Sequence, residues 1–211
     1  MAAIDTARLK DMFGAIAAAI ETERDRLCAL DGVIGDADHG IAMALGFNAA
    51  RDAVAALDSS IDPTALLNTA AKAFLNAVGA SSGPLYATAF MRAAASVKGK
   101  QSLDDADVVT MFQAMAKGIA DRGKATIGEK TMIDAWLPAA DAAVAAHHNG
   151  GGLPQSLSAA VEAARAGMEA TKSMIATKGR SARLGERSVG HVDPGAASAL
   201  IVIEAVRKAL C

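Results

Sequence analysis

The chain has 211 residues, which is enough for a substantial core, and we expect one domain over residues 1–211. Its net charge of −2 gives no electrostatic reason to expect a nucleic-acid or membrane surface. The apolar content is 52%, much of it alanine, and aromatic residues make up only 3%, which is typical of closely packed helices. The chain shows neither a signal-peptide pattern nor an apolar run that could span a bilayer, so we expect a cytoplasmic protein.

Apolar residues recur at spacings of three and four along most of the chain, and no segment alternates with period two. This pattern predicts an all-α fold without strands, with helices at about 5–30, 39–57, 63–79, 84–97, 102–123, 132–148, 154–176 and 194–210. Asp62 and Pro63 are a typical N-cap and first helical residue. Ser102 and Asp105 resemble a capping box, and Pro138 should kink the sixth helix or separate its first turn.

Short connections between these helices favour an antiparallel, up-and-down bundle. In such a bundle the first, third, fifth and seventh connections lie at one end. These are residues 31–40, 79–84, 123–131 and 177–194, and they hold most of the glycine and charge outside the helices. The other connections are ordinary turn sequences. We therefore expect the unusual residues to converge on one rim of the bundle.

The first of these connections contains three carboxylates, Asp31, Asp36 and Asp38, within one glycine-rich turn. Carboxylates this close repel one another unless a cation lies among them, and oxygen-only ligands suit Mg²⁺. His39 and Gly40 open the next helix, whose free N–H groups and dipole favour a phosphate. The alternative is a solvated acidic turn in which Asp38 is an ordinary N-cap.

The sequences of the third and fifth connections are less specific indicators of a ligand site. Residues 79–83 offer backbone N–H groups and two serine hydroxyls at a helix start, which suits a phosphate, although a helix stop followed by a serine cap would look the same. Lys124 and Lys130 lie in the fifth connection, where a solvated charged turn is the ordinary interpretation. These two segments become informative only if they lie beside the acidic turn.

The seventh connection, residues 177–193, is a long, basic and glycine-containing segment. Loops of this length inside a compact domain usually have a function. Its arginines, Arg180, Arg183 and Arg187, could hold phosphate oxygens, and the glycines would let the segment move as a lid. A basic surface loop is the alternative. We expect His39 and His191 to be hydrogen-bonding residues of the rim. The P-loop pattern is absent, and the residues that follow Asp36 do not match the pattern of an EF-hand calcium loop.

These connections together resemble the nucleotide-binding L subunit of the dihydroxyacetone kinase family. The matching segments are Gly35-Asp-Ala-Asp-His-Gly40, Ser82-Gly-Pro-Leu-Tyr86, Arg122-Gly-Lys124, Lys130-Thr-Met132, Lys178-Gly-Arg180, Leu184-Gly-Glu-Arg-Ser188, Gly190-His191 and Asp193-Pro-Gly195. The resemblance covers nearly the whole chain. It implies a barrel of eight antiparallel helices with the nucleotide site at one rim, in agreement with the independent helix count.

The resemblance also implies roles for individual residues. Two Mg²⁺ ions bridging the phosphates of ATP or ADP would be held by Asp31, Asp36 and Asp38. The phosphates would be lined by His39, Gly40, Ile41, Ala42, Ser81 and Ser82, and contacted from the lid by Arg180. The adenine would be bordered by Gly123 and Met132, and the pocket closed by Asp193, Pro194 and Gly195. The catalytic residues would be Asp31, Asp36, Asp38 and Arg180.

In this family the substrate is held by a histidine on a separate K subunit, so the resemblance implies a kinase that is active only with a partner. The donor is left open between free ATP and a bound ADP that a phosphocarrier M subunit rephosphorylates. The acceptor is left open between dihydroxyacetone, a four-carbon ketose and another acceptor, because Arg183 replaces a common tyrosine on the lid. A non-catalytic nucleotide-dependent regulator and a homodimer are further alternatives.

Overall fold

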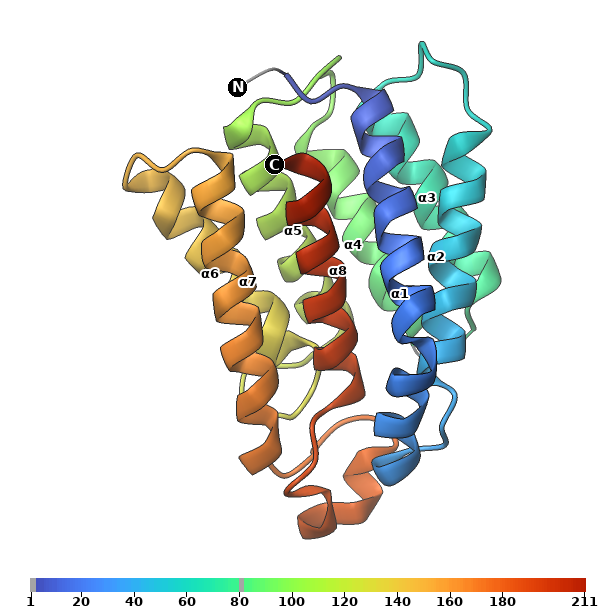
Figure 1. Ribbon diagram of the computed structural model, residues 1–211, viewed down its shortest axis with the longest axis vertical. Coiled ribbons are helices and arrows are strands. Elements are labelled where there is room, and N and C mark those ends of the chain that lie inside the picture. Colours follow the sequence, from blue (N-terminus) through green and yellow to red (C-terminus); the bar gives the residue numbers. More distant parts are fainter. Residues whose placement is uncertain (1–2, 80–81) are drawn as a thin grey trace.

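The computed structural model describes residues 3–79 and 82–211, and the all-helical prediction is confirmed (Figure 1). Over these residues the only strand-like feature is an isolated antiparallel bridge between Ile4 and Leu103. The elements are α1 (Thr6–Ile34), α2 (His39–Ala55), α3 (Pro63–Ala77), α4 (Ser82–Ser96), α5 (Asp105–Gly123), α6 (Ile133–His148), α7 (Leu153–Ala170), the 3₁₀ helices η1 (Thr171–Ser173) and η2 (Ser181–Ser188), and α8 (Pro194–Leu210).

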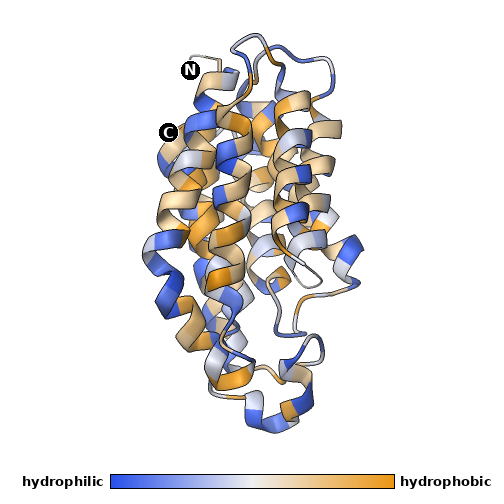
Figure 2. Ribbon diagram, turned by 90° about the vertical axis from the view of Figure 1, so that its right-hand side faces the viewer, coloured by the Kyte–Doolittle hydropathy of each residue, from blue (hydrophilic) through white to orange (hydrophobic). Residues whose placement is uncertain are grey.

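Each α-helix packs against the next one in the chain, and α8 packs against α1, so the contacts form a closed sequence. Both chain ends lie at one end of the molecule, whereas the connections α1–α2, α5–α6 and α7–α8 lie toward the other end (Figure 1). Figure 2 shows hydrophobic residues concentrated where the helices pack and hydrophilic ones more frequent in the loops at the lower end. This lower end is where the sequence predicted a functional rim.

The interior between the helices is filled mainly by small and aliphatic side chains around one aromatic cluster. The ring of Phe47 lies 5.1 Å from that of Phe74 and 5.3 Å from that of Tyr86, both in edge-to-face geometry. Phe90 extends the cluster to Phe13 of α1, and Trp136 of α6 extends it to Phe112 of α5. Edge-to-face pairs add about 0.5–1.5 kcal/mol each beyond their area burial, so this cluster fixes how α2, α3, α4 and α6 meet.

Several helix limits differ from those predicted. Helix α1 continues four residues beyond residue 30, because Ile34 is buried and the Gly35 N–H bonds to the carbonyl of Asp31. Asp31 therefore lies in the last turn of a helix. The predicted capping box is wrong: the box is formed by Asp104 and Asp107, whose side chains each accept a backbone N–H of the other. The bridge between Leu103 and Ile4 keeps residue 103 extended and moves the helix start.

Helix α6 runs without interruption through Pro138, so the predicted separation of its first turn does not occur. Proline has no N–H, so the carbonyl of Asp134 lacks its usual intrahelical partner. Gly167 of α7 packs directly on this carbonyl, since a Cβ at Gly167 would lie 1.8 Å from its oxygen. The segment 177–193 also differs from the structureless loop that was predicted, because it contains η2.

Among the described helices, none is both long enough and apolar enough to cross a membrane.

Gly167→Ala should destabilise the protein, whereas Gly14→Ala should not. The added methyl at residue 167 meets a backbone oxygen that cannot move without α6, and overpacking of this kind costs about 1–3 kcal/mol. Gly14 lies inside α1, and apart from its own stretch of helix no described atom lies within 4 Å of its Cβ position, so alanine there should stabilise the helix by about 0.5–1 kcal/mol. Urea unfolding of both variants measures the difference, and equal midpoints would contradict the close approach of α6 and α7.

Candidate functional site

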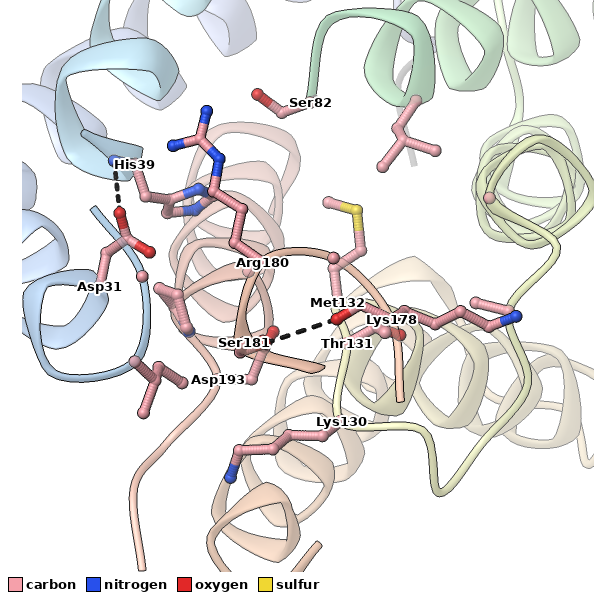
Figure 3. Close-up of a pocket in the computed structure, with 18 of the residues that line it drawn as sticks. Asp31, His39, Ser82, Lys130, Thr131, Met132, Lys178, Arg180, Ser181 and Asp193 are labelled. Carbon is pink, nitrogen blue, oxygen red and sulfur yellow. Dashed lines mark hydrogen bonds between the residues drawn. The ribbon is translucent and has the colours of Figure 1, made fainter. Parts of the chain in front are cut away.

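A cavity of about 340 Å³ opens at the lower end of the bundle (Figure 3). It is lined from four places that are far apart in the sequence: the α1–α2 turn, the start of α4, the α5–α6 connection and the α7–α8 connection. Its lining residues are Asp31, Ile34, Gly35, Asp36, Asp38, His39, Ser82, Leu85, Ile119, Gly123, Ala125, Lys130–Ile133, Lys178–Ser181 and Asp193–Gly195. The convergence predicted from the up-and-down order is confirmed.

The three acidic residues of the α1–α2 turn form one cluster. Each offers a carboxylate oxygen, and these atoms lie within 4.8 Å of one another. Asp31 is buried, while Asp36 and Asp38 are exposed. Gly35 permits this packing, because a Cβ there would lie 2.1 Å from Oδ1 of Asp31. A cluster made only of carboxylate oxygens has the donor chemistry of a hard divalent cation.

Asp31 is held in place by the start of α2. Its Oδ2 accepts the backbone N–H groups of Asp38, at 3.0 Å, and of His39, at 3.3 Å. Asp38 occupies the N-cap position, but its side chain makes no capping hydrogen bond to any described residue. The interpretation of Asp38 as an ordinary N-cap is therefore wrong, and its carboxylate remains directed toward the acidic cluster.

Arg180 reaches this cluster from the α7–α8 connection. Its guanidinium pairs with Asp36 and also lies 3.4 Å from Oδ2 of Asp38. Both acidic partners are about half exposed, so these pairs contribute little to stability. Their significance is positional, because they place a basic group of residues 177–193, called the lid segment below, directly over the acidic cluster.

His39 is partly buried and is anchored by a contact with α8. Its Nε2 lies 2.9 Å from the hydroxyl of Ser198 in α8, and that hydroxyl donates to the carbonyl of Gly195 at 3.0 Å. Burial lowers the pKa of His39, and the nearby carboxylate of Asp31 opposes this effect. The contact agrees with the predicted hydrogen-bonding role and ties the start of α2 to the start of α8.

Only some of the other residues that were predicted to bind phosphate line the cavity. Ser82 lines the cavity with a buried hydroxyl that has no partner among the described residues. Ser81 lies outside the described residues. Gly40, Ile41 and Ala42 are not among the lining residues: Gly40 packs on the carbonyl of Arg24, Ile41 is 51% exposed, and the N–H of Ala42 bonds to the carbonyl of Asp38.

The opposite wall of the cavity is apolar and surrounds the predicted base-binding residues Gly123 and Met132. Leu85 of α4, Ile119 of α5 and Ile133 of α6 complete this wall. Sequence analysis missed these three because an apolar residue at helical spacing looks the same whether it faces the core or a cavity. The apolar wall would suit an aromatic base, and the opposite, charged end of the same cavity would suit phosphates.

The α5–α6 connection is shaped by buried charges that sequence analysis missed. Asp134 is buried and accepts the N–H groups of Gly128, at 2.6 Å, and of Thr131, at 2.7 Å. Lys130 was expected to be solvated, and that expectation is wrong because the residue is 1% exposed. In the sequence, both residues look like ordinary charges flanking a helix start.

Comparison with known proteins identifies the family. The DAK2 domain matches residues 33–208. The chain belongs to the DAK2 domain family. The resemblance inferred from the sequence motifs is thereby confirmed.

Two curated relatives match the DAK2 domain chain almost end to end. One is the ADP-binding subunit DhaL of a PEP-dependent dihydroxyacetone kinase of Listeria innocua, with 38% identity over 98% of both chains. The other is the corresponding ADP-binding subunit of Escherichia coli, with 39% identity over 87% of both chains. L-erythrulose 1-kinase of Mycolicibacterium smegmatis is 34% identical over 95% of this chain, which spans 34% of that protein.

Among solved structures, dihydroxyacetone kinase from C. freundii in complex with AMP-PNP and Mg²⁺ superposes with a TM-score of 0.75 and 25% identity. The match covers 99% of this chain and 35% of that one. The DAK2 domain thus corresponds to about a third of the C. freundii enzyme. The named relatives are kinases, as was expected from the sequence.

Asp193 should make the stability of this domain depend on pH. It caps α8 by accepting the N–H of Ala196 at 2.7 Å, and burial, with a further contribution from Asp134, raises its pKa to about 7. The folded state therefore retains a proton that the unfolded state loses near the ordinary aspartate pKa of 3.8. Between these pKa values the free energy of unfolding should fall as pH rises, by up to about 1.4 kcal/mol per pH unit.

Asp193→Asn removes this titration and keeps a good N-cap residue. Relative to the wild-type protein, the variant should gain stability as pH rises from about 4 to 7, and other titrating groups cancel in the difference. Urea unfolding across this range measures both proteins. Parallel stability curves would contradict a protonated, buried Asp193.

Proposed function

We propose that this chain is the nucleotide-binding, phosphoryl-transferring subunit of a dihydroxyacetone kinase. The observation that carries the proposal is the facing arrangement of Asp31, Asp36 and Asp38 with Arg180 at one end of a cavity whose other wall is apolar. A polyphosphate needs charge neutralisation at one end, and a base needs an apolar slot at the other. The names of the full-length relatives, which are ADP-binding kinase subunits, support the same assignment.

The acidic cluster suits Mg²⁺, and we propose specifically that the three aspartates hold two Mg²⁺ ions. Bound there, Mg²⁺ would neutralise charge on the phosphate oxygens during transfer. Asp31 is the pre-oriented ligand, because two backbone N–H groups hold its Oδ2. Asp36 and Asp38 are exposed, so they can adjust around the cations.

The remaining residues position the nucleotide. Arg180 can exchange its carboxylate partners for phosphate oxygens, with which guanidinium forms paired, charge-assisted hydrogen bonds. The hydroxyl of Ser82, which has no hydrogen-bond partner among the described residues, is available to a phosphate oxygen on the side of α4. The lid segment covers these groups and would exclude water from the reacting phosphate.

For the donor, we propose ADP that stays bound and is rephosphorylated by a phosphocarrier subunit. The support is that the two relatives of nearly this length are named ADP-binding subunits of PEP-dependent kinases. Exchange of free ATP is the alternative, favoured by the AMP-PNP complex of the longer C. freundii enzyme. The partners would then be a substrate-binding K subunit and, for the first donor, an M subunit.

For the acceptor, we propose dihydroxyacetone held on the K subunit. The polar groups of the described cavity are concentrated around the acidic cluster and the lid, and its other wall is apolar, which leaves no obvious place for a small ketose. A four-carbon ketose is the second candidate, because L-erythrulose 1-kinase is 34% identical over 95% of this chain.

Asp36→Asn should abolish binding of Mg-ADP while the fold remains intact. The change removes one cation ligand and releases Arg180, but Asp36 is exposed, so the free energy of unfolding should change by no more than about 1 kcal/mol. Asp141→Asn, on the exposed face of α6, is the matched control and should bind as the wild-type protein does. Calorimetry with Mg-ADP measures affinity, and unchanged affinity in the Asp36 variant would refute the metal assignment.

The purified chain with Mg-ATP and dihydroxyacetone should show no turnover until a cognate K subunit is added. An assay with dihydroxyacetone and with erythrulose, each with ATP or with PEP and the phosphocarrier proteins, separates the donor and acceptor alternatives. Fast turnover by the chain alone would mean that it holds the acceptor itself.

A further inference from the structure

Lys130 has two features, each of which lowers the stability of the folded state. Its side chain is 1% exposed, and its backbone is in the left-handed region with φ of +58°. Non-glycine residues adopt this conformation only at a cost in free energy, and burial of an ammonium adds to that cost. Lys124, in the same connection, also has a left-handed backbone, with φ of +48°, but its side chain is exposed. The surroundings of Lys130 must therefore compensate for its burial.

That compensation comes from two backbone carbonyls. The Lys130 ammonium donates hydrogen bonds of 2.5 Å to the carbonyl oxygens of Thr171 and His191. Burial lowers the pKa of Lys130, and the carboxylates of Asp193 and Asp134 oppose the shift. Figure 3 shows the Lys130 side chain directed away from Arg180 and Ser82, so its ammonium is not placed to contact a phosphate beside them.

The two carbonyls lie at the two ends of the stretch that carries the lid. Thr171 follows the last residue of α7, and His191 lies two residues before Asp193, the N-cap of α8. Two more bonds hold these ends together: the N–H of Gly190 donates to the carbonyl of Lys172 at 2.7 Å, and the N–H of Asp193 donates to the hydroxyl of Thr171 at 3.0 Å. Lys130 is the side chain that joins both ends to the α5–α6 connection.

The same connection supplies the cavity wall. Thr131, Met132 and Ile133 follow Lys130 directly and line the cavity, and Lys178–Ser181 line it from the lid. The position of Arg180 relative to the apolar wall therefore depends on how the base of the lid is attached to that wall. Within the described residues, the Lys130 ammonium makes that attachment at both ends of the stretch. Glu129 adds contacts at one end: its carbonyl accepts the N–H of Thr177, and its carboxylate accepts the Thr177 hydroxyl and pairs with Lys178.

We propose that Lys130 is a positioning residue, which fixes Thr171 and His191, the two ends of the stretch that carries the lid segment, and thereby the start of α8, against the wall of the nucleotide cavity. The proposal rests on the proposed function for its ligand, but the attachment itself can be tested without ligand. Loss of the ammonium should release the base of the lid, increase local opening and misplace Arg180.

The first test compares Lys130→Met with Lys124→Met in limited trypsin digestion without ligand. Methionine keeps the length of the side chain and the left-handed backbone but removes the charge and the donors. Cleavage after Arg183 and Arg187, identified by mass spectrometry, should be about tenfold faster in the Lys130 variant, because local opening is more favourable. The Lys124 variant should behave as the wild-type protein, and equal cleavage of all three would overturn the proposal.

The second test repeats the digestion with Mg-ADP, at a temperature where circular dichroism shows each variant to be folded. Mg-ADP should protect the wild-type and Lys124→Met proteins, and about tenfold more of it should be required by Lys130→Met. Protection of Lys130→Met at the same concentration would overturn the positioning role. Failure of Mg-ADP to protect even the wild-type protein would instead contradict the proposed function, while the ligand-free comparison would still decide the attachment.

A measurement on the wild-type protein covers the case in which Lys130→Met does not fold. NMR of the ¹⁵N-labelled lysine ammonium groups should show slowly exchanging protons for Lys130 and rapidly exchanging ones for Lys124. Hydrogen bonds to buried carbonyls protect the first, and solvent reaches the second. A Lys130 ammonium that exchanges as fast as that of Lys124 would overturn the proposal.

Discussion

The mutual repulsion of three neighbouring carboxylates is the constraint on which the site depends. Asp31, Asp36 and Asp38 present oxygens within 4.8 Å of one another, a geometry that costs free energy unless positive charge is nearby. The protein supplies that charge in two forms: the N–H groups at the start of α2 and the guanidinium of Arg180. The first belongs to the helical scaffold, and the second belongs to the lid segment.

A second group of charges, buried beneath the cavity, organises the backbone. Asp134 shapes the α5–α6 connection, Asp193 caps α8, and Lys130 bonds to the carbonyls of Thr171 and His191 at the two ends of the stretch that carries the lid segment. Removing one member of such a group leaves the others buried without compensation, which is costly. The protein thus separates charges directed toward a ligand from charges that determine where the loops lie.

Close backbone approach connects these groups to the helices. Gly35 allows the turn to pack on Asp31, and Gly167 allows α7 to pack on the carbonyl that Pro138 leaves without a partner. Both glycines have negative or extended backbone geometry, so space rather than conformational freedom explains them. They allow close packing within the α1–α2 turn and between α6 and α7.

The sequence alone determined the helical fold, the order of the helices and the meeting of four connections at one end. Apolar spacing is a local signal, and short connections leave few topologies. The sequence also indicated that the three aspartates and Arg180 belong to the site, because charge clusters and long loops are visible without coordinates. Tertiary structure alone decided the burial of Lys130, the missing cap at Asp38, the continuity of α6 through Pro138 and the choice of Leu85, Ile119 and Ile133 as cavity wall. Each of these depends on what a distant segment places beside the residue, and neither side-chain type nor spacing contains that information.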